Sequence, residues 1–381
     1  MPHYRCVGAV PRKRHTKAFD ADGNRLFEEL VGTEGFSRES SLLYHRSSPS
    51  AILGVEPVDA PDARPGGGIG PRHFRTGDLP TGVDLVTGRR RLLANDDVTI
   101  AFARTSAPSP LYRSVVGDEL IYLHDGTARL ESVFGAMTVE PGDYVVIPAG
   151  VTHRWVPGSD VVAALVVESS GHVRVPDKYL SPHGQLLEGA PFSERDLRGP
   201  DRPVRVDEDD VPVLVRTRTG WMRYRHATHP FDVAGWDGCV YPHALSIHDF
   251  EPIVGRIHQP PPVHQTWALP GAVVCSFVPR PYDFDPDAVR VPYHHHNVDS
   301  DEVLFYAEGD FMSRSGSGIG RGSISLHPAG FTHGPQPGSS DKADVVDGTD
   351  EIAVMVDTFR PLEVLADAAD VEAPGYSSSW R

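Results

Sequence analysis

Two stretches of the chain, about 180 positions apart, follow the same pattern of residues. Each begins with a glutamate, Glu119 or Glu302, and reads Glu-x6-Gly, then Gly-x5-Pro-x-Gly-x2-His, ending at His153 or His333. Glycine and proline at fixed offsets mark the turns between short strands. The repeated pattern predicts two small antiparallel barrels, each able to enclose a ligand among inward-facing side chains.

Only the second stretch has a leading histidine, in the pattern His295-x-Asn297-x4-Glu302. Residues of equal parity on a strand face the same side, so His295 and Asn297 are expected to point into the barrel. The chain then carries Glu302 onto the next strand, and the turn before His333 returns that residue to the same point. Two imidazoles and one carboxylate with open coordination positions are the ligand set of non-haem Fe(II) oxygenases. The sequence therefore predicts one Fe(II) per chain, held by His295, Glu302 and His333.

Neighbouring residues offer alternative ligands. The triple histidine leaves open whether His294 and His296 form only a solvated cluster, and Asp301 could replace Glu302 as the carboxylate. Spacing from Gly309 favours Glu302, and Asp301 should point to the other side of its strand. A chance match without metal is the competing interpretation of the motif.

The first stretch lacks the leading histidine. Tyr112 takes its place, and Ser114 replaces the asparagine. A phenol is a poor neutral ligand beside imidazole and carboxylate. We therefore expect a structural first barrel without metal, in which Glu119 and His153 are hydrogen-bonded.

Turn-forming residues are frequent, with 37 glycines and 35 prolines among 381 residues. This composition predicts a mainly β fold with few short helices. Helical signals are limited to residues 18–30, 193–197 and 362–369. The predicted organisation is an N-terminal segment with the first barrel over residues 1–171, a connecting scaffold over 172–247 and the catalytic barrel over 248–381.

The formal net charge of −16 argues against nucleic acid and against anionic membrane surfaces as partners. No apolar run approaches the length of a membrane span, and the N-terminus does not resemble a signal peptide. Cys6, Cys239 and Cys275 are too few and too scattered for a disulfide framework. A cytoplasmic protein is expected.

Three further histidines, His248, His258 and His264, lie among prolines just ahead of the second barrel motif. In a rigid loop, each could simply satisfy backbone groups. A loop at the mouth of a barrel is also where a general base could be held. The residues alone leave both interpretations open.

The paired motifs resemble the cupin superfamily, and the chain as a whole is similar to bacterial homogentisate 1,2-dioxygenases. The residues that carry the second resemblance are Lys13-Arg-His-Thr, Glu28-Glu-Leu-Val-Gly, Ser40-Ser-Leu-Leu-Tyr-His, Trp236-Asp-Gly-Cys-Val-Tyr-Pro, His258-Gln-Pro-Pro-Pro-Val-His, Asn297-Val-Asp-Ser-Asp-Glu, Gly322-Ser-Ile-Ser-Leu-His-Pro-Ala-Gly and His333-Gly-Pro-Gln-Pro-Gly. The resemblance implies a bicupin of two jelly-roll barrels that cleaves the ring of homogentisate with O2. The product would be maleylacetoacetate, in tyrosine and phenylalanine breakdown, and the assembly a homo-oligomer, a trimer or hexamer.

The resemblance also implies roles for single residues. By the family's pattern, Fe(II) is held by the three ligands already named, His248 is the general base and His327 is a second active-site histidine. Asn297 is then a candidate to orient the substrate or a metal ligand.

One position departs from the family. A tyrosine that can hydrogen-bond the substrate usually lies nine residues beyond the glutamate, where this chain has Phe311. Losing such a donor typically costs about 1–3 kcal/mol of discrimination, unless Tyr293, Tyr306 or a water substitutes. Homogentisate is therefore the expected substrate, and gentisate or another hydroquinone acid is the alternative. A metal-dependent isomerase would need more imidazole ligands, and a non-catalytic bicupin is disfavoured by the intact spacing.

Overall fold

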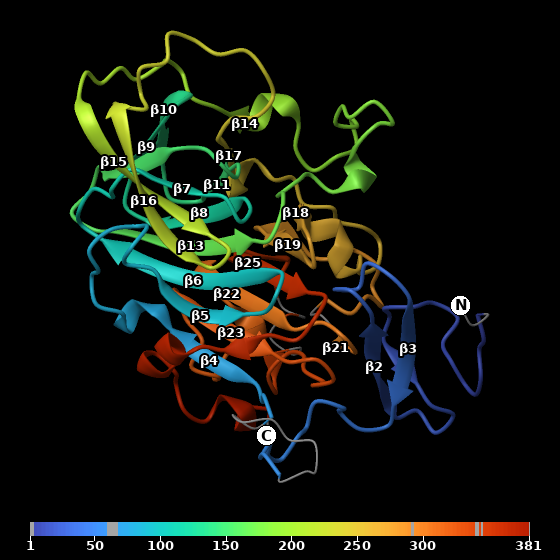
Figure 1. The fold of residues 1–381 in the computed structure, drawn as a ribbon. Helices are drawn as coiled ribbons and strands as arrows, with labels where there is room; N and C mark the ends of the chain where they lie inside the picture. The colour runs from blue at the N-terminus through green and yellow to red at the C-terminus, as the bar shows by residue number, and fades with distance from the viewer. Residues whose placement is uncertain (1–3, 59–67, 291–292, 340–342, 344–345, 381) are drawn as a thin grey trace.

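The computed structural model describes residues 4–58, 68–290, 293–339, 343 and 346–380. It confirms the expected mainly β bicupin, with the strands of the first barrel above those of the second in Figure 1. No helix among the described residues is long and apolar enough to cross a membrane.

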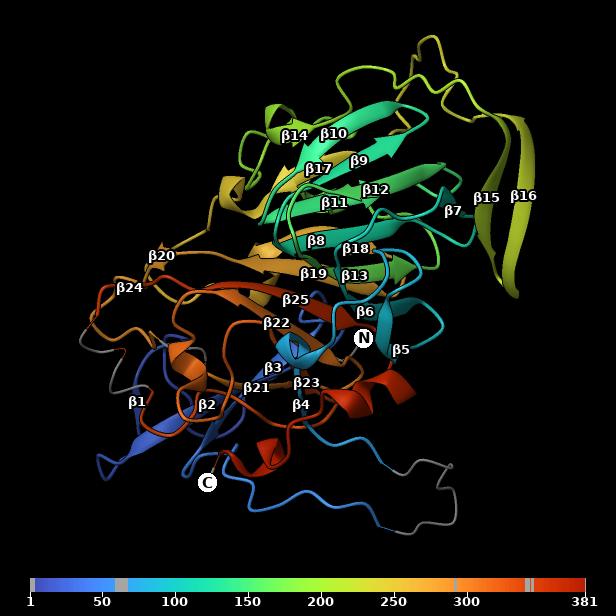
Figure 2. The ribbon, with the colours of Figure 1, turned by 90° about the vertical axis from the view of Figure 1, so that its left-hand side faces the viewer.

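The first barrel consists of two sheets. Their strand orders are β10-β9-β12-β7-β15-β16 and β14-β17-β11-β8-β13-β6-β5-β26. The strands are β5 (Arg90–Ala94), β6 (Val98–Thr105), β7 (Tyr112–Ser114), β8 (Glu119–Asp125), β9 (Ala128–Ser132), β10 (Gly135–Val139), β11 (Asp143–Ile147), β12 (His153–Pro157), β13 (Val162–Ser169), β14 (Leu197–Arg198), β15 (Asp209–Thr217), β16 (Gly220–Thr228), β17 (His243–Ser246) and β26 (Glu363–Val364). Figure 2 shows the β15–β16 hairpin standing beside this barrel.

The second barrel is built on a sheet of order β18-β19-β25-β22-β23-β4, with a smaller layer in which β2 lies between β21 and both β1 and β3. The strands are β1 (Ala18–Phe19), β2 (Arg25–Gly32), β3 (Ser40–His45), β4 (Arg72–Arg75), β18 (Gln265–Leu269), β19 (Ala272–Phe277), β20 (Arg280–Pro281), β21 (His294–Asn297), β22 (Glu302–Glu308), β23 (Ser323–His327), β24 (Gly348–Thr349) and β25 (Ile352–Thr358). Strand β20 pairs with β24.

Strand pairing crosses both predicted domain boundaries, at residues 171 and 247. The N-terminal strands β2 and β4 pair with β21 and β23 of the second barrel. Strands β14 to β17, from the predicted connecting scaffold, belong to the sheets of the first barrel. Strand β26, near the C-terminus, returns to pair with β5. The three consecutive segments are therefore interleaved, because each barrel recruits strands from beyond its own motif.

The predicted helix over residues 18–30 is wrong. This segment forms β1 and β2, because β2 pairs on one side with β21 and on the other with β3. Tertiary pairing thus overrides the local helix propensity. The other two helical signals fall on short 3-10 helices, η3 (Glu194–Asp196) and η7 (Ala366–Asp370). The remaining 3-10 helices are η1 (Thr76–Asp78), η2 (Asp177–Tyr179), η4 (Ile247–Asp249), η5 (Pro261–His264), η6 (Met312–Arg314) and η8 (Tyr376–Ser378).

The glycine that ends each Glu-x6-Gly pattern is required by the backbone. Gly126 and Gly309 have φ angles of 73° and 92°, in the region that favours glycine. A Cβ atom would lie 2.2 Å from the Val161 carbonyl oxygen in the first case and 2.4 Å from that of Asp350 in the second. The repeated glycine is therefore required by a tight turn at the end of the equivalent strand in both barrels.

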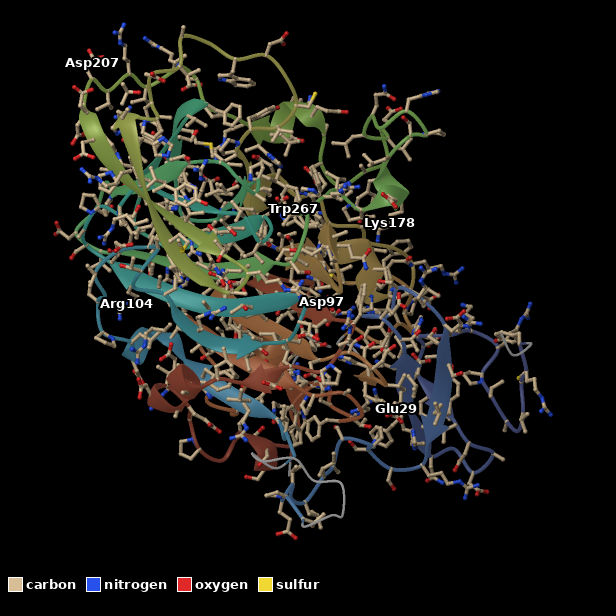
Figure 3. All side chains as sticks on the ribbon, in the orientation of Figure 1. Glu29, Asp97, Arg104, Lys178, Asp207 and Trp267 are labelled. Carbon is tan, nitrogen blue, oxygen red and sulfur yellow. The ribbon has the colours of Figure 1, made fainter. Side chains whose placement is uncertain are left out.

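The two barrels share one hydrophobic core. The rings of Phe102 and Phe305, one from each barrel, have centroids 5.7 Å apart. Trp267, labelled in Figure 3, is buried against Tyr144 of the first barrel, and the Tyr144 hydroxyl lies 2.8 Å from Ser276 Oγ. Burying several large aromatic side chains is strongly favourable. The second barrel is thus packed against the first over a broad apolar face.

Inside the first barrel, Glu119 is held as expected by hydrogen bonds. It accepts a bond of 2.9 Å from the Tyr112 hydroxyl and two bonds, of 2.7 and 3.1 Å, from the Arg89 guanidinium. Burial raises the pKa of Glu119, but the charge of Arg89 outweighs it and brings the pKa to about 2. His153 has Nδ1 bonded to the Val151 carbonyl oxygen, at 3.1 Å. His153 is therefore hydrogen-bonded as expected, but only through Nδ1, because its buried Nε2 has no partner among the described residues.

Replacing Arg89 tests the importance of this buried charge pair. We expect Arg89→Leu to lower the free energy of unfolding by about 3–5 kcal/mol, because Glu119 is left buried without its cation. Urea denaturation measures the change. The control Arg321→Gln removes a half-exposed ion pair with Asp125 and should cost less than about 1 kcal/mol. Equal effects of the two substitutions would contradict the assignment.

Candidate metal centre

Three side chains of the second barrel converge on one point. His295 lies on β21, Glu302 begins β22 and His333 follows β23. His295 Nε2 lies 3.4 Å from Glu302 Oε2, and His333 Nε2 lies 3.2 Å from Glu302 Oε1. Their potential ligand atoms all lie within 4.8 Å of one another, the one such His/Cys/Asp/Glu group among the described residues. The sequence-predicted ligands are therefore brought together.

Backbone contacts fix both imidazoles. The chain segments at His295 and His333 exchange two backbone hydrogen bonds, of 2.8 and 3.0 Å. Nδ1 of His295 lies 2.9 Å from the Tyr293 carbonyl oxygen, and Nδ1 of His333 lies 2.9 Å from that of Phe331. A carbonyl oxygen only accepts, so both Nδ1 atoms carry a proton, and the two Nε2 atoms, the potential ligand atoms, face Glu302. Two neutral imidazoles and one carboxylate in this arrangement fit a divalent cation.

Glu302 is oriented by a further histidine. His327 lies opposite Glu302 in the β22–β23 register, with Nδ1 2.8 Å from Glu302 Oε1. Because the carboxylate only accepts, His327 Nδ1 donates, and Nε2 accepts a bond of 2.8 Å from the Tyr376 hydroxyl. Burial raises the pKa of Glu302, but His333, His295 and His327 together hold it well below its usual value. His327 thus acts on the metal ligand and is a positioning residue.

The alternative ligands have other partners. His294 Nδ1 lies 2.9 Å from Ser50 Oγ, and His296 Nδ1 lies 2.8 Å from Glu29 Oε1. Glu29 is labelled in Figure 3, on the N-terminal strand layer. These two histidines are therefore hydrogen-bonded and are not merely a solvated cluster. Asp301 turns away, as expected.

Asp301 supports the backbone. Its carboxylate accepts bonds of 2.8 Å from the Ala329 amide and 2.7 Å from the Leu362 amide. These contacts anchor the turn that leads to His333 and the chain after β25. The choice of Glu302 as the ligand carboxylate agrees with this geometry.

A cavity opens beside the metal ligands. Its polar lining includes His295, Glu302, His258, His264, Arg280 and Arg314. A second pocket shares His258, His264, Arg280 and Glu351 with this cavity and adds Asp283 and Tyr282. The shared residues lie between the two spaces. The two spaces are therefore neighbours.

His248, the predicted general base, does not lie in this cavity. It is exposed on η4, and its Nε2 would be 2.8 Å from a Cβ atom placed on Gly142 of the first barrel. The described residues that line the cavity do not include it. A base must come within hydrogen-bond reach of its substrate, so the assignment to His248 is corrected. His258 and His264, which the sequence left open, both line the cavity.

The predicted substrate contacts divide into two groups. Tyr293 and Tyr306 line the cavity. The Tyr293 hydroxyl is buried without a hydrogen-bond partner among the described residues. Phe311 does not line the cavity and packs edge-on against Tyr306, with ring centroids 4.9 Å apart. Phe311 therefore does not occupy the place of a substrate donor.

Asn297 has a supporting contact instead of a place in the cavity. Its Oδ1 accepts a bond of 3.3 Å from the Phe36 amide. The Phe36 ring packs edge-on against the His295 imidazole, with centroids 5.7 Å apart. Asn297 thus helps to hold the N-terminal segment over a metal ligand.

The repeat supplies a matched pair of substitutions for metal binding. Glu302→Gln should weaken divalent-metal binding by more than about 100-fold, because it removes a ligand and its charge, a larger loss than that of a supporting contact. Glu119→Gln changes the equivalent residue of the first barrel and should leave metal binding unchanged. Titration against a metal-chelating dye measures both affinities. Retention of metal by Glu302→Gln, or equal loss in both variants, would contradict the assignment.

The chain is similar to several known proteins. The N-terminal family model of homogentisate 1,2-dioxygenases matches residues 81–247. A Saccharolobus solfataricus protein named "Putative dioxygenase" is 37% identical, over 100% of this chain and 99% of its own. The homogentisate 1,2-dioxygenase of Bradyrhizobium diazoefficiens is 26% identical, over 70% of this chain and 61% of its own. A solved cupin barrel protein from Leptotrichia buccalis, 9% identical, aligns with a TM-score of 0.36 over 76% of this chain and 96% of its own. This chain belongs to the homogentisate 1,2-dioxygenase family.

Proposed function

We propose that the protein is a non-haem Fe(II) dioxygenase that cleaves the ring of homogentisate with O2 to give 4-maleylacetoacetate. The observation that carries the proposal is the group of His295, Glu302 and His333 at the wall of a cavity. Two neutral imidazoles and one carboxylate leave the other coordination positions to the substrate and O2. Membership of the family supports dioxygenase activity. Among hydroquinone acids, homogentisate is the proposed substrate.

Fe(II) held by these three residues would supply redox chemistry toward O2 and would lower the pKa of a bound phenol. The chain contributes the orientation of the donors. The carbonyl oxygens of Tyr293 and Phe331 fix the two imidazoles, and His327 fixes the carboxylate. A site organised in this way needs little rearrangement when the cation binds.

His258 is the proposed general base, in place of His248. It lines the cavity that His295 and Glu302 also line, and its Nδ1 lies 3.6 Å from Asp283 Oδ2. Burial lowers the pKa of His258, with Asp283 acting in the opposite direction, so the imidazole is neutral at neutral pH. A neutral imidazole can remove the proton of a ring hydroxyl, and Asp283 then stabilises the imidazolium.

The remaining wall of the cavity is apolar. Phe277, Leu304 and Met355 contribute side chains to it. Such a surface suits the face of an aromatic ring and excludes water from the reacting atoms. The cavity thus combines an apolar wall for a ring with polar groups for its substituents.

A related hydroquinone acid such as gentisate is the second candidate substrate. The relative that matches the full length of the chain is named only as a dioxygenase. The named homogentisate dioxygenase of Bradyrhizobium diazoefficiens is matched over 61% of its length.

Oxygen uptake by anaerobically reconstituted protein tests the function. We expect Fe(II)-loaded protein to consume one O2 per homogentisate, with the ring-opened product identified by absorbance and mass spectrometry. Gentisate and unsubstituted hydroquinone complete the panel. Turnover by metal-free protein, or a Zn(II)-loaded protein with isomerase activity and no oxygen uptake, would overturn the proposal.

Two histidine variants test the base. His258→Ala should lower kcat by about 10²–10⁴-fold while retaining iron, because a general base acts on the substrate and not on the metal. His248→Ala is the matched control and should keep wild-type kcat. Steady-state oxygen uptake and iron analysis are the measurements. The reverse pattern would restore His248 as the base.

A further inference from the structure

Arg314 is a buried cation in the metal cavity. It ends η6, its exposed fraction is 6%, and it lines the cavity together with His295 and Glu302. No motif in the sequence marks this residue, and none of the steps proposed above uses it. Burying a guanidinium is costly unless a compensating group is present.

The protein contacts of Arg314 are all uncharged. Nη1 donates to the Gly334 carbonyl oxygen, at 2.7 Å, and Nε donates to the Tyr306 hydroxyl, at 3.0 Å. The guanidinium carbon lies 5.9 Å from the centroid of the Trp380 ring. Among the ion pairs of the described residues, none joins Arg314 to a carboxylate. These contacts use only part of a group that has five N–H donors.

Two other arginines of the same fold show the contrast. Arg89 is equally buried in the first barrel but has two carboxylates, with Nη1 2.7 Å from Glu119 and 2.9 Å from Glu168. Arg280 shares the metal cavity with Arg314, and its Nη1 lies 3.7 Å from Glu351. Two carboxylates also line the cavity, but Glu302 lies against His295, His327 and His333, and Glu351 lies beside Arg280. An anionic ligand would supply the missing charge for Arg314.

We propose that Arg314 binds the carboxylate of the substrate and makes the enzyme specific for hydroquinones that carry one anionic substituent. This rests on the proposed function for the identity of the diol ring. The free N–H groups of a guanidinium match the two oxygens of a carboxylate, and charge-assisted bonds of this kind are stronger than neutral ones. Gly334 and Tyr306 hold the side chain in place before the substrate binds, which reduces the entropic cost of binding.

Anaerobic calorimetry on the Fe(II)-loaded protein tests this assignment without turnover. Arg314→Gln should weaken homogentisate binding by about 10- to 100-fold, the loss expected for a hydrogen bond to a charged group. The same variant should bind 2-methylhydroquinone, which has the diol and lacks the carboxylate, with an affinity within about threefold of that of the wild type, because only a weak contact is lost. Arg314→Lys keeps the charge but loses the paired donors, so it should give an intermediate affinity for homogentisate.

The control variant is Arg321→Gln, which removes one arginine from the exposed surface and should leave both affinities unchanged. Iron content is measured for every variant, because Arg314 contacts the carbonyl of the residue that follows His333. Equal weakening of both ligands, or loss of iron that accounts for the whole change, would show a structural arginine and overturn the proposal.

A second measurement needs no variant. Phenylacetate has the carboxylate without the diol, and benzyl alcohol has neither. Wild-type protein should bind phenylacetate at least about tenfold more tightly than benzyl alcohol, because only phenylacetate can make the charge-assisted contact. Equal affinities would overturn the assignment. Binding of homogentisate that depends on Arg314 but is not followed by oxygen uptake would refute the proposed function and leave this inference intact. Oxygen uptake together with binding that does not depend on Arg314 would refute this inference and leave the proposed function intact.

Discussion

The second barrel depends on keeping one buried carboxylate ionised. Glu302 is 4% exposed, and its oxygens contact the imidazoles of His295, His327 and His333. Burial alone would favour the protonated acid, which would bind a cation poorly and accept the bond from His327 less well. Because His327 must donate to it, and because the carbonyls of Tyr293 and Phe331 orient the other two rings, the strands around Glu302 select one arrangement of protons. That arrangement directs two Nε2 atoms at the site of a metal.

The first barrel also keeps a buried glutamate ionised, but with different neighbouring residues. Glu119 stands at the equivalent position, and there an arginine, Arg89, supplies the positive charge that a metal would supply in the second barrel. Tyr112, in place of the leading histidine, completes the set with its hydroxyl. A protein cation is fixed in place and leaves no position open to a ligand. This barrel can therefore act as a rigid partner, whose aromatic residues pack against the wall of the catalytic barrel.

The repeat predicted most of the framework, because turns and strand alternation have local signals. It placed Glu119 and Glu302 at the start of equivalent strands and brought His333 to His295. It could not identify Arg89 or Arg314, since neither is a position of the repeated pattern: Arg89 lies just before β5, and Arg314 ends η6. The helix predicted over residues 18–30 was wrong because the strand that contains the helix-forming residues Glu28 and Glu29 pairs with β21. This partner lies more than 260 positions away in the sequence. His248 was chosen from a local match and is exposed, whereas His258, ten positions further on, lines the cavity.

The pairing of β2 with β21 has a consequence for how the protein is made. His295 lies beside Leu30 from the beginning of the chain, and His327 is held by Tyr376 from near its end. The strands from residue 90 to 169 pair largely among themselves, so most of the first barrel can assemble while synthesis continues. Contacts between distant positions form slowly, because the intervening chain must first be ordered. The surroundings of the metal ligands are thus completed only after the segment from Leu30 to Tyr376 has been synthesised, which favours late capture of the metal.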